Sequence, residues 1–190
     1  MEWVIGIDEV GRGPLAGPVT VCALFTPVSM CSRLEGFNLD SKRLLPTVRQ
    51  RISKHLHWMR REGLVNFKIT SVSPFIIDRK GIVYAINLAI RDCLKALSHP
   101  AAKCQVLLDG GLRAPAKYKN QKTIVRGDAT VPIIGLASVL AKVHRDRLMT
   151  NLSVRHPSWG FDRHKGYGTR AHYAALRKHG PSPIHRLTYL

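Results

Sequence analysis

The chain of 190 residues has 30 Lys and Arg against 12 Asp and Glu, which gives a formal net charge of +18 at pH 7. Apolar residues make up 45% of the sequence, a fraction that excludes a disordered chain and suits one globular domain with a substantial core. No apolar run approaches the roughly 18 residues that span a bilayer, so we expect no membrane partner. The positive charge is spread along the chain without a polybasic tail, which favours a folded surface that binds nucleic acid.

The N-terminal segment and the cysteines predict a cytoplasmic protein. The first residues, MEWVIGIDEVGRG, contain three acids where a signal peptide has a basic start and a long apolar run. The four cysteines form no CxxC pair, so we expect reduced thiols and no zinc site.

The first part of the chain predicts a β-hairpin followed by a helix. An apolar run at residues 4–7 indicates a strand that ends at two acids and a glycine turn, residues 11–13. Residues 18–25 are rich in β-branched and aromatic side chains, which is typical of a second strand paired with the first. From Pro46 to Gly63, apolar residues recur at helical spacing with basic residues between them, which predicts a helix with a basic outer face.

The rest of the chain alternates strands with helices. Residues 65–72 alternate like a strand, and Pro74 then begins a helix that runs towards His99 and is weakened locally at Gly81. Short strands are expected at 105–108 and 123–125, and helices at 131–149 and 169–179. This order predicts an α/β sandwich with a mixed sheet.

Four acids occupy comparable positions at the ends of predicted strands. Asp8 and Glu9 close the first strand, Asp109 follows an apolar strand and precedes two glycines, and Asp128 follows Gly127. Hydrolysis of a phosphodiester by two divalent ions requires several carboxylate oxygens that converge on metals roughly 4 Å apart. These four acids could supply the oxygens.

Two alternatives for these acids remain open. Each acid could cap a turn or pair with one of the many basic side chains. Asp146 lies between Arg145 and Arg147 and one turn after Lys142, where local ion pairs are expected. It nevertheless competes with Asp128 for the last ligand position.

Seven short segments, in order along nearly the whole chain, carry a family resemblance. They are IGIDEVGRGPLAGPV at 5–19, LDSKRL at 39–44, LLDG at 107–110, RGD at 126–128, ASVLAKVHRDRLM at 137–149, HKGYGT at 164–169 and PIHR at 183–186. Together they resemble the ribonuclease HII family of the bacterial type. The resemblance implies a ribonuclease H-like α/β fold, with a mixed five-stranded sheet flanked by helices. It also implies one catalytic domain over residues 1–190, with a helical C-terminal extension at about 150–190.

The resemblance further implies which residues carry out the chemistry. The acids Asp8, Glu9, Asp109 and Asp128 would bind two Mg²⁺ or Mn²⁺ ions, with Asp8 bridging both. The reaction implied is cleavage of the RNA strand of RNA/DNA hybrids and of duplex DNA on the 5′ side of an embedded ribonucleotide. Its products would carry 5′-phosphate and 3′-hydroxyl ends.

Recognition of a ribose in any sequence requires contacts to the backbone and the sugar, because the 2′-hydroxyl is the only local chemical difference. Glycine lets main-chain groups approach a minor groove, so the turn Gly11, Arg12 and Gly13 suits this task, and the resemblance gives the turn the same role. By resemblance Tyr167 would pack on the sugar that follows the ribonucleotide. An ordinary tight turn and a loop anchor are the alternatives. The candidate phosphate contacts are Lys42, ranked first, then Lys142, Lys165 and Arg186.

The sequence therefore predicts a monomeric metal-dependent endoribonuclease that acts on RNA/DNA hybrids and on duplex DNA containing ribonucleotides. One rival is a resolvase or transposase type of nuclease with the same broad fold, which would act on DNA only. The other is a noncatalytic basic module that binds nucleic acid, in which the acids would be partners in salt bridges.

Overall fold

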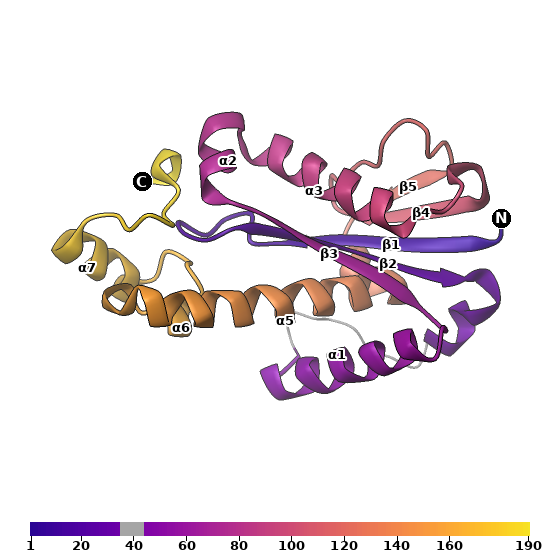
Figure 1. Cartoon of the computed structure of the whole chain (residues 1–190), viewed down its shortest axis with the longest axis horizontal. Helices are drawn as coiled ribbons and strands as arrows, with labels where there is room; N and C mark the ends of the chain where they lie inside the picture. Colours follow the sequence, from indigo (N-terminus) through magenta and orange to yellow (C-terminus); the bar gives the residue numbers. More distant parts are fainter. Residues whose placement is uncertain (35–43) are drawn as a thin grey trace.

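The computed structural model describes residues 1–34 and 44–190. A five-stranded mixed sheet with the order β3-β2-β1-β4-β5 forms its centre (Figure 1). The antiparallel pairs are β1 with β2 and β2 with β3, and the parallel pairs are β1 with β4 and β4 with β5. The strands are β1 (Trp3–Val10), β2 (Val19–Pro27), β3 (Asn66–Val72), β4 (Cys104–Asp109) and β5 (Gln121–Ile124). The predicted hairpin and the predicted mixed five-stranded sheet are both confirmed.

Helices cover both faces of the sheet. On one face, α2 and α3 pack against Ile5 and Ile7 of β1. On the other face, α1 and α5 pack against Val4, because successive side chains of a strand point to opposite sides. The helices are α1 (Pro46–Arg61), α2 (Pro74–Lys80), α3 (Ile82–Leu97), α4 (Gly127–Thr130), α5 (Pro132–Arg155), α6 (Phe161–His164) and α7 (Arg170–His179), and short 3₁₀ turns occupy Val28–Leu34, Ala101–Lys103, Pro157–Trp159 and Leu187–Tyr189.

Beyond one end of the sheet, α6 and α7 lie around the C-terminal end of α5, and the last residues of the chain turn back to α2, where Leu187 and Thr188 donate hydrogen bonds to Asp78 (Figure 1). A small apolar cluster of Ala16, Met149 and Phe161 joins this part to the loop between β1 and β2. An isolated bridge between Ala16 and His185 also links the two. This arrangement places the C-terminal segments against the predicted glycine turn.

The strand expected at 123–125 lies at Gln121–Ile124, and three other predicted boundaries were wrong for reasons that the structure shows. The single helix expected from Pro74 to His99 is divided at Gly81, whose φ of +83° breaks the helix into α2 and α3. The helix expected at 131–149 extends as α5 to Arg155, because no glycine or proline intervenes between Leu136 and His156. The third is the end of β1.

The first strand does not end at Ile7 but continues through Asp8 and Glu9 to Val10. Antiparallel pairing with β2 runs as far as Val10 opposite Thr20, so the backbone stays extended. Parallel pairing with β4 stops earlier, at Ile7 opposite Leu108. On the β4 side, the sheet therefore opens immediately before Asp8 and Asp109.

Within the described residues, no helix is long and apolar enough to cross a membrane.

Candidate active site

Three carboxylates converge where β1 and β4 separate. Asp8 and Glu9 of β1 and Asp109 of β4 each offer an oxygen, and these oxygens all lie within 4.8 Å of one another. We call Asp8, Glu9 and Asp109 the carboxylate cluster. Its formation follows from the topology, because the carboxyl ends of neighbouring parallel strands meet at one edge and Asp8 and Asp109 each follow the last paired residue. The amide of Glu9 also donates a hydrogen bond of 2.7 Å to Asp8 Oδ1.

The cluster holds negative charge in a poorly solvated place. Burial raises the pKa of Asp8 well above its usual range, and the nearby Glu9 and Asp109 carboxylates raise it further, while a hydrogen bond with Ser138 opposes the rise. Burial likewise raises the pKa of Glu9, although Arg12 lies 3.7 Å from its carboxylate. The Arg12 side chain is largely exposed, so its compensation is weak. A divalent cation among these oxygens would relieve the repulsion, and hard oxygen ligands fit Mg²⁺ or Mn²⁺.

A cavity of about 260 Å³ opens onto the carboxylate cluster. It is lined by the predicted turn Gly11, Arg12 and Gly13 and by Tyr167, so the structure brings these predicted substrate contacts to the same place as the acids. Ser138 and Lys142 of α5 complete much of the wall. The cavity therefore combines acids, two basic side chains, main-chain groups and one aromatic ring.

The fourth predicted acid stands beside the cluster rather than in it. Asp128 is buried at the start of α4, and its amide donates a hydrogen bond of 3.2 Å to Asp109 Oδ1. Its carboxylate is not among the oxygens that lie within 4.8 Å of one another. The competing acid, Asp146, pairs with Lys142 at 2.8 Å and lines a different hollow.

The predicted phosphate contacts have different outcomes. Lys42 lies outside the described residues. Lys142 lines the cavity, and its ammonium lies 5.7 Å from the centre of the Tyr167 ring. Lys165 donates from its ammonium to Thr150 at 2.8 Å. The interpretation of Arg186 as a phosphate contact was wrong, because its side chain is fully buried.

Two buried arginines hold the glycine turn, and we call Arg145 and Arg186 the arginine clamp. Arg186 donates to the carbonyls of Gly11, Arg12 and Gly17 at 2.6 to 3.0 Å. Arg145 of α5 donates to the carbonyls at positions 16, 18 and 165 at 2.9 to 3.2 Å. Burial lowers the pKa of Arg145 to about 10, so the side chain stays charged at neutral pH.

The clamp fits only a turn that has glycine at its first position. Gly11 has a φ of +90°, and a Cβ there would lie 2.3 Å from Nε of Arg145. Sequence analysis did not identify Arg145 as a positioning residue. A signal was present, since Ala137, Ala141, Arg145 and Met149 are spaced by four and thus share the buried face of α5.

Comparisons with known proteins agree with this geometry. The profile of the family described as Ribonuclease HII matches residues 5–190. A curated relative, Ribonuclease HII of Xylella fastidiosa (strain M12), is 41% identical over 189 residues, covering 98% of this chain and 76% of the relative.

Solved structures of similar fold include ribonuclease H2 from Pyrococcus horikoshii OT3, with a TM-score of 0.73 at 24% identity over 98% of this chain and 93% of that one. Bst-RNase HIII in complex with Mn²⁺ has a TM-score of 0.70 at 16% identity, over 98% of this chain and 67% of that one. These two likenesses confirm the predicted ribonuclease H-like fold, while the family profile and the curated relative extend the agreement to sequence. The chain therefore belongs to the ribonuclease HII family and is a metal-dependent endonuclease of the ribonuclease H type.

Proposed function

We propose that this protein hydrolyses the RNA strand of RNA/DNA hybrids and cuts duplex DNA on the 5′ side of an embedded ribonucleotide. The observation that carries the proposal is the carboxylate cluster, whose three oxygens lie within 4.8 Å of one another beside a turn suited to a minor groove. Two Mg²⁺ or Mn²⁺ ions, when bound, would supply an activated water and stabilise the leaving 3′ oxygen. The products are a 5′-phosphate and a 3′-hydroxyl.

The acids hold the ions in this proposal. Asp8 would be the ligand shared by the two ions, because it is the most buried of the three and the charges of both Glu9 and Asp109 act on it. Asp128 is the fourth ligand rather than Asp146, since its amide already contacts Asp109 whereas Asp146 is paired with Lys142. The Mn²⁺ complex of Bst-RNase HIII supports the choice of a divalent ion.

The glycine turn recognises the 2′-hydroxyl. Since the carbonyls of Gly11 and Arg12 already accept hydrogen bonds from Arg186, we assign the contact to the amide groups of the turn. Tyr167, whose side chain is partly exposed on the cavity wall, packs on the sugar of the next deoxynucleotide. Neither contact reads a base edge, so the enzyme tolerates any sequence.

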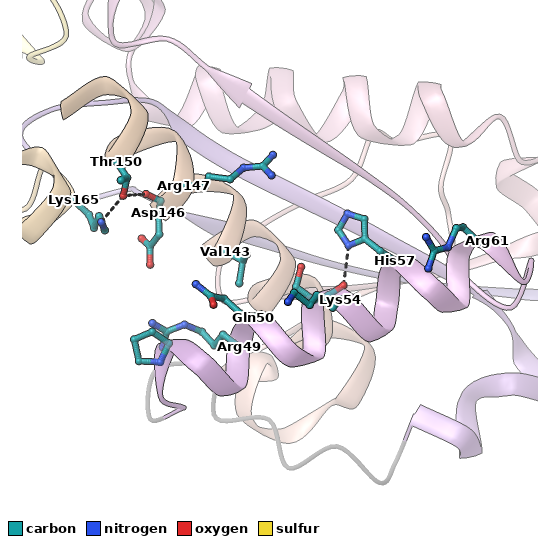
Figure 2. A pocket seen from close by; sticks show the side chains of 12 residues that line it. Arg49, Gln50, Lys54, His57, Arg61, Val143, Asp146, Arg147, Thr150 and Lys165 are labelled. Atoms are coloured by element: carbon teal, nitrogen blue, oxygen red, sulfur yellow. Dashed lines mark hydrogen bonds between the residues drawn. The ribbon is translucent and has the colours of Figure 1, made fainter. Parts of the chain in front are cut away.

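A basic groove between α1 and α5 extends the path of the nucleic acid. It has a volume of about 950 Å³, and Figure 2 shows side chains of α1 facing those of α5 across it. Among its described lining residues the one acid, Asp146, is paired with Lys142, which lines the neighbouring active-site cavity. The cations of the groove are Arg49, Lys54 and Arg61 of α1, Arg147 of α5, and Lys165. This charge suits a phosphate backbone.

The groove can be tested with a matched pair of double variants. Lys54→Gln with Arg147→Gln removes two exposed cations of the groove, whereas Arg91→Gln with Lys95→Gln removes two exposed cations of α3 on the opposite face. The groove variant is expected to weaken binding to a long duplex and to lower the slope of log K against log salt by about 2. Equal slopes for the two variants would place the nucleic acid elsewhere.

The catalytic proposal is tested by cleavage of labelled duplexes, with one embedded ribonucleotide or with DNA alone, in the presence and absence of Mg²⁺. Cleavage is expected only for the ribonucleotide and only with the ion. Asp109→Asn and Asp128→Asn should each lower kcat by about 100-fold or more, and Asp146→Asn by less than about threefold. Cleavage of DNA alone favours a resolvase-like nuclease, and no cleavage by the wild type favours a noncatalytic binding module.

We also propose that the chain acts as a single catalytic domain over residues 1–190, as a monomer and in the cytoplasm. The clamp supports the single domain, because Arg186 contacts a turn 175 residues earlier in the sequence. Light scattering with size-exclusion chromatography tests the monomer, and one cooperative unfolding transition by calorimetry tests the single domain. A mass of twice 21.2 kDa would contradict the first expectation.

A further inference from the structure

Four histidines lie close together in the part of the molecule beyond α5. His172 of α7 and His185 are buried, and His164 stacks on His172 with ring centres 4.2 Å apart. His156 contacts the ring of Phe161, which also contacts the other three. None of these histidines touches the carboxylate cluster or lines its cavity.

The hydrogen bonds of His172 and His185 run in one direction only. The amide of Ser182 can only donate, so Nδ1 of His185 accepts its bond of 2.7 Å and the ring proton of His185 is on Nε2. That proton is donated over 2.9 Å to Nε2 of His172. The proton of His172 is then on Nδ1, which donates over 3.0 Å to the carbonyl of Tyr167.

Both ends of this histidine chain, His185 to His172, impose the same direction. The carbonyl of Tyr167 can only accept, so it requires a proton on Nδ1 of His172, as the Ser182 amide already does from the other end. A second proton on His172 would set two N–H groups against each other at 2.9 Å. A second proton on His185 would oppose the Ser182 amide at 2.7 Å, although the Ser182 hydroxyl at 2.8 Å could accept it. The amide and carbonyl contacts of both rings are all satisfied together only when both rings are neutral.

We propose that the histidine chain positions Tyr167, so that recognition of the junction after a ribonucleotide depends on two neutral, oriented imidazoles. This inference rests on the proposed function, in which Tyr167 packs on the substrate sugar. His172 and His185 are positioning residues, because they act through the Tyr167 backbone and not on the substrate.

The histidines hold the loop that carries Tyr167 together with Arg145, which donates to the Lys165 carbonyl, and the Leu15 amide, which donates to the Gly166 carbonyl. The Tyr167 carbonyl accepts from His172 and from the amide of Thr169, and the Tyr167 amide donates to the carbonyl of His164. The amide of Gly166 donates to Nδ1 of His164 at 3.2 Å, which leaves Nε2 of His164 to donate to the carbonyl of Trp159 at 2.7 Å. A neutral His164 of defined tautomer therefore supports the same loop.

The surroundings keep the histidine chain neutral. Burial lowers the pKa of His185 to about 4, and the neighbouring His172, His164 and His156 contribute to the same direction. Burial also lowers the pKa of His172. Four other cations lie near the loop: Arg145 and Lys142, each 5.7 Å from the centre of the Tyr167 ring, Arg186 of the clamp, and Lys165. The remaining titratable groups there are Asp162, which accepts a hydrogen bond from Ser153, and His179, which contacts Trp159.

The first test measures the wild-type protein directly. Two-dimensional ¹⁵N NMR of the histidine rings at pH 7 should show the proton on Nε2 of His185 and on Nδ1 of His172. Any other pair of tautomers, or a charged ring at pH 7, would overturn the chain whether or not the protein cleaves the proposed substrate.

The second test is a double-mutant cycle with Tyr167. The readout is the ratio of kcat/KM on a duplex with one ribonucleotide to kcat/KM on a long RNA/DNA hybrid. Tyr167→Ala is expected to lower this ratio about tenfold, and His172→Phe about three- to tenfold. In the Tyr167→Ala background His172→Phe should change the ratio less than about twofold. His179→Phe, the same change in an exposed histidine of α7, should leave it unaltered.

The outcomes separate the two proposals. If the wild type cleaves neither substrate, the proposed function fails. If the wild type cleaves both and His172→Phe keeps the ratio, or lowers it equally in both backgrounds, the histidine chain does not act through Tyr167.

Discussion

The carboxylate cluster and the arginine clamp both bury charge, but only the clamp surrounds its charges with partners. Arg145 and Arg186 donate hydrogen bonds of 2.6 to 3.2 Å to main-chain carbonyls, so the two guanidinium groups are satisfied without any acid. In the cluster three carboxylates face one another, and among the described residues the basic group that pairs with one of them is the largely exposed Arg12. The comparison teaches that a buried charge whose hydrogen bonds are all made stabilises the structure. A buried charge that faces only like charges marks a place for a ligand.

The largest expected effect comes from removing charge from the cluster. Asp8→Asn should lower kcat by about 1,000-fold or more, because Asp8 is the proposed bridging ligand. Without metal, the same change should raise the free energy of unfolding at pH 7 by about 1 kcal/mol or more, since burial disfavours the charged Asp8. Urea denaturation in EDTA measures this.

The control for Asp8→Asn is the same denaturation with Mg²⁺. The wild type should gain stability from the ion, and the variant should gain less. A variant that is less stable than the wild type in EDTA would show that the cluster is complete without a ligand, and the comparison would fail.

The clamp should respond in the opposite way. Arg186→Met removes the donor for the buried carbonyls of Gly11 and Gly17 and for the carbonyl of the exposed Arg12, so we expect the free energy of unfolding to fall by about 3 kcal/mol or more. Arg177→Met on the exposed side of α7 should change it by less than about 0.5 kcal/mol. Arg186→Lys should not restore the stability, because an ammonium cannot form the planar fork. Full stability of Arg186→Lys would mean that charge alone suffices.

A pair of glycine variants separates the clamp from the substrate contact. Gly11→Ala should destabilise the fold by about 2 kcal/mol, because of its positive φ and the clash with Arg145. At Gly13 a Cβ meets nothing within 4 Å, so Gly13→Ala should change the free energy of unfolding by less than about 0.5 kcal/mol. It should instead raise KM for the duplex. Thermal melts and steady-state kinetics measure the two effects. Similar melting losses in both variants would contradict this division.

The last effect is a dependence of the free energy of unfolding on pH, to which His185 and the carboxylate cluster contribute with opposite signs. The folded pKa of His185, about 4, lies below the usual 6.5, so between these values only the unfolded chain is protonated. Protonation of His185 in the unfolded chain therefore lowers the free energy of unfolding as the pH falls from about 6.5 to 4, by at most about 1.4 kcal/mol per pH unit. The raised pKa of Asp8 acts in the reverse sense in metal-free protein. Denaturation of Asp8→Asn across this range removes the Asp8 contribution, and stability that rises in this variant as the pH falls would contradict the histidine contribution.

Much of the fold follows from local patterns. The β1–β2 hairpin, the basic face of α1 and the order of strands and helices are all visible as apolar periodicity and turn residues. The end of β1 could not be read from periodicity, because it depends on strand pairing. The strand continues past Ile7 because β2 remains paired with it, and no local pattern contains that information. At Gly81 the sequence indicates only a locally weakened helix, and the positive φ in the structure shows that the helix is broken there.

The site likewise contains residues that the sequence predicts and residues that only the tertiary structure reveals. The acids Asp8, Glu9 and Asp109 could be predicted because strand ends and family motifs both mark them, and their convergence is a property of the sheet. The role of Arg186 could not, because a basic residue in a chain with 30 of them gives no local sign of burial. Its partners lie at residues 11, 12 and 17, and only the tertiary structure brings them together.

The contact between Arg186 and the glycine turn has a consequence for the order in which the enzyme matures. Residue 186 leaves the ribosome 174 residues after Arg12, so a growing chain can pair β1 with β2 and β4 long before its clamp arrives. Metal ligands would thus be assembled in a nascent or proteolytically shortened chain whose turn is still loose. Under the proposed function, selectivity for ribose would be acquired only once residue 186 has emerged, and it would be lost when a protease removes that residue.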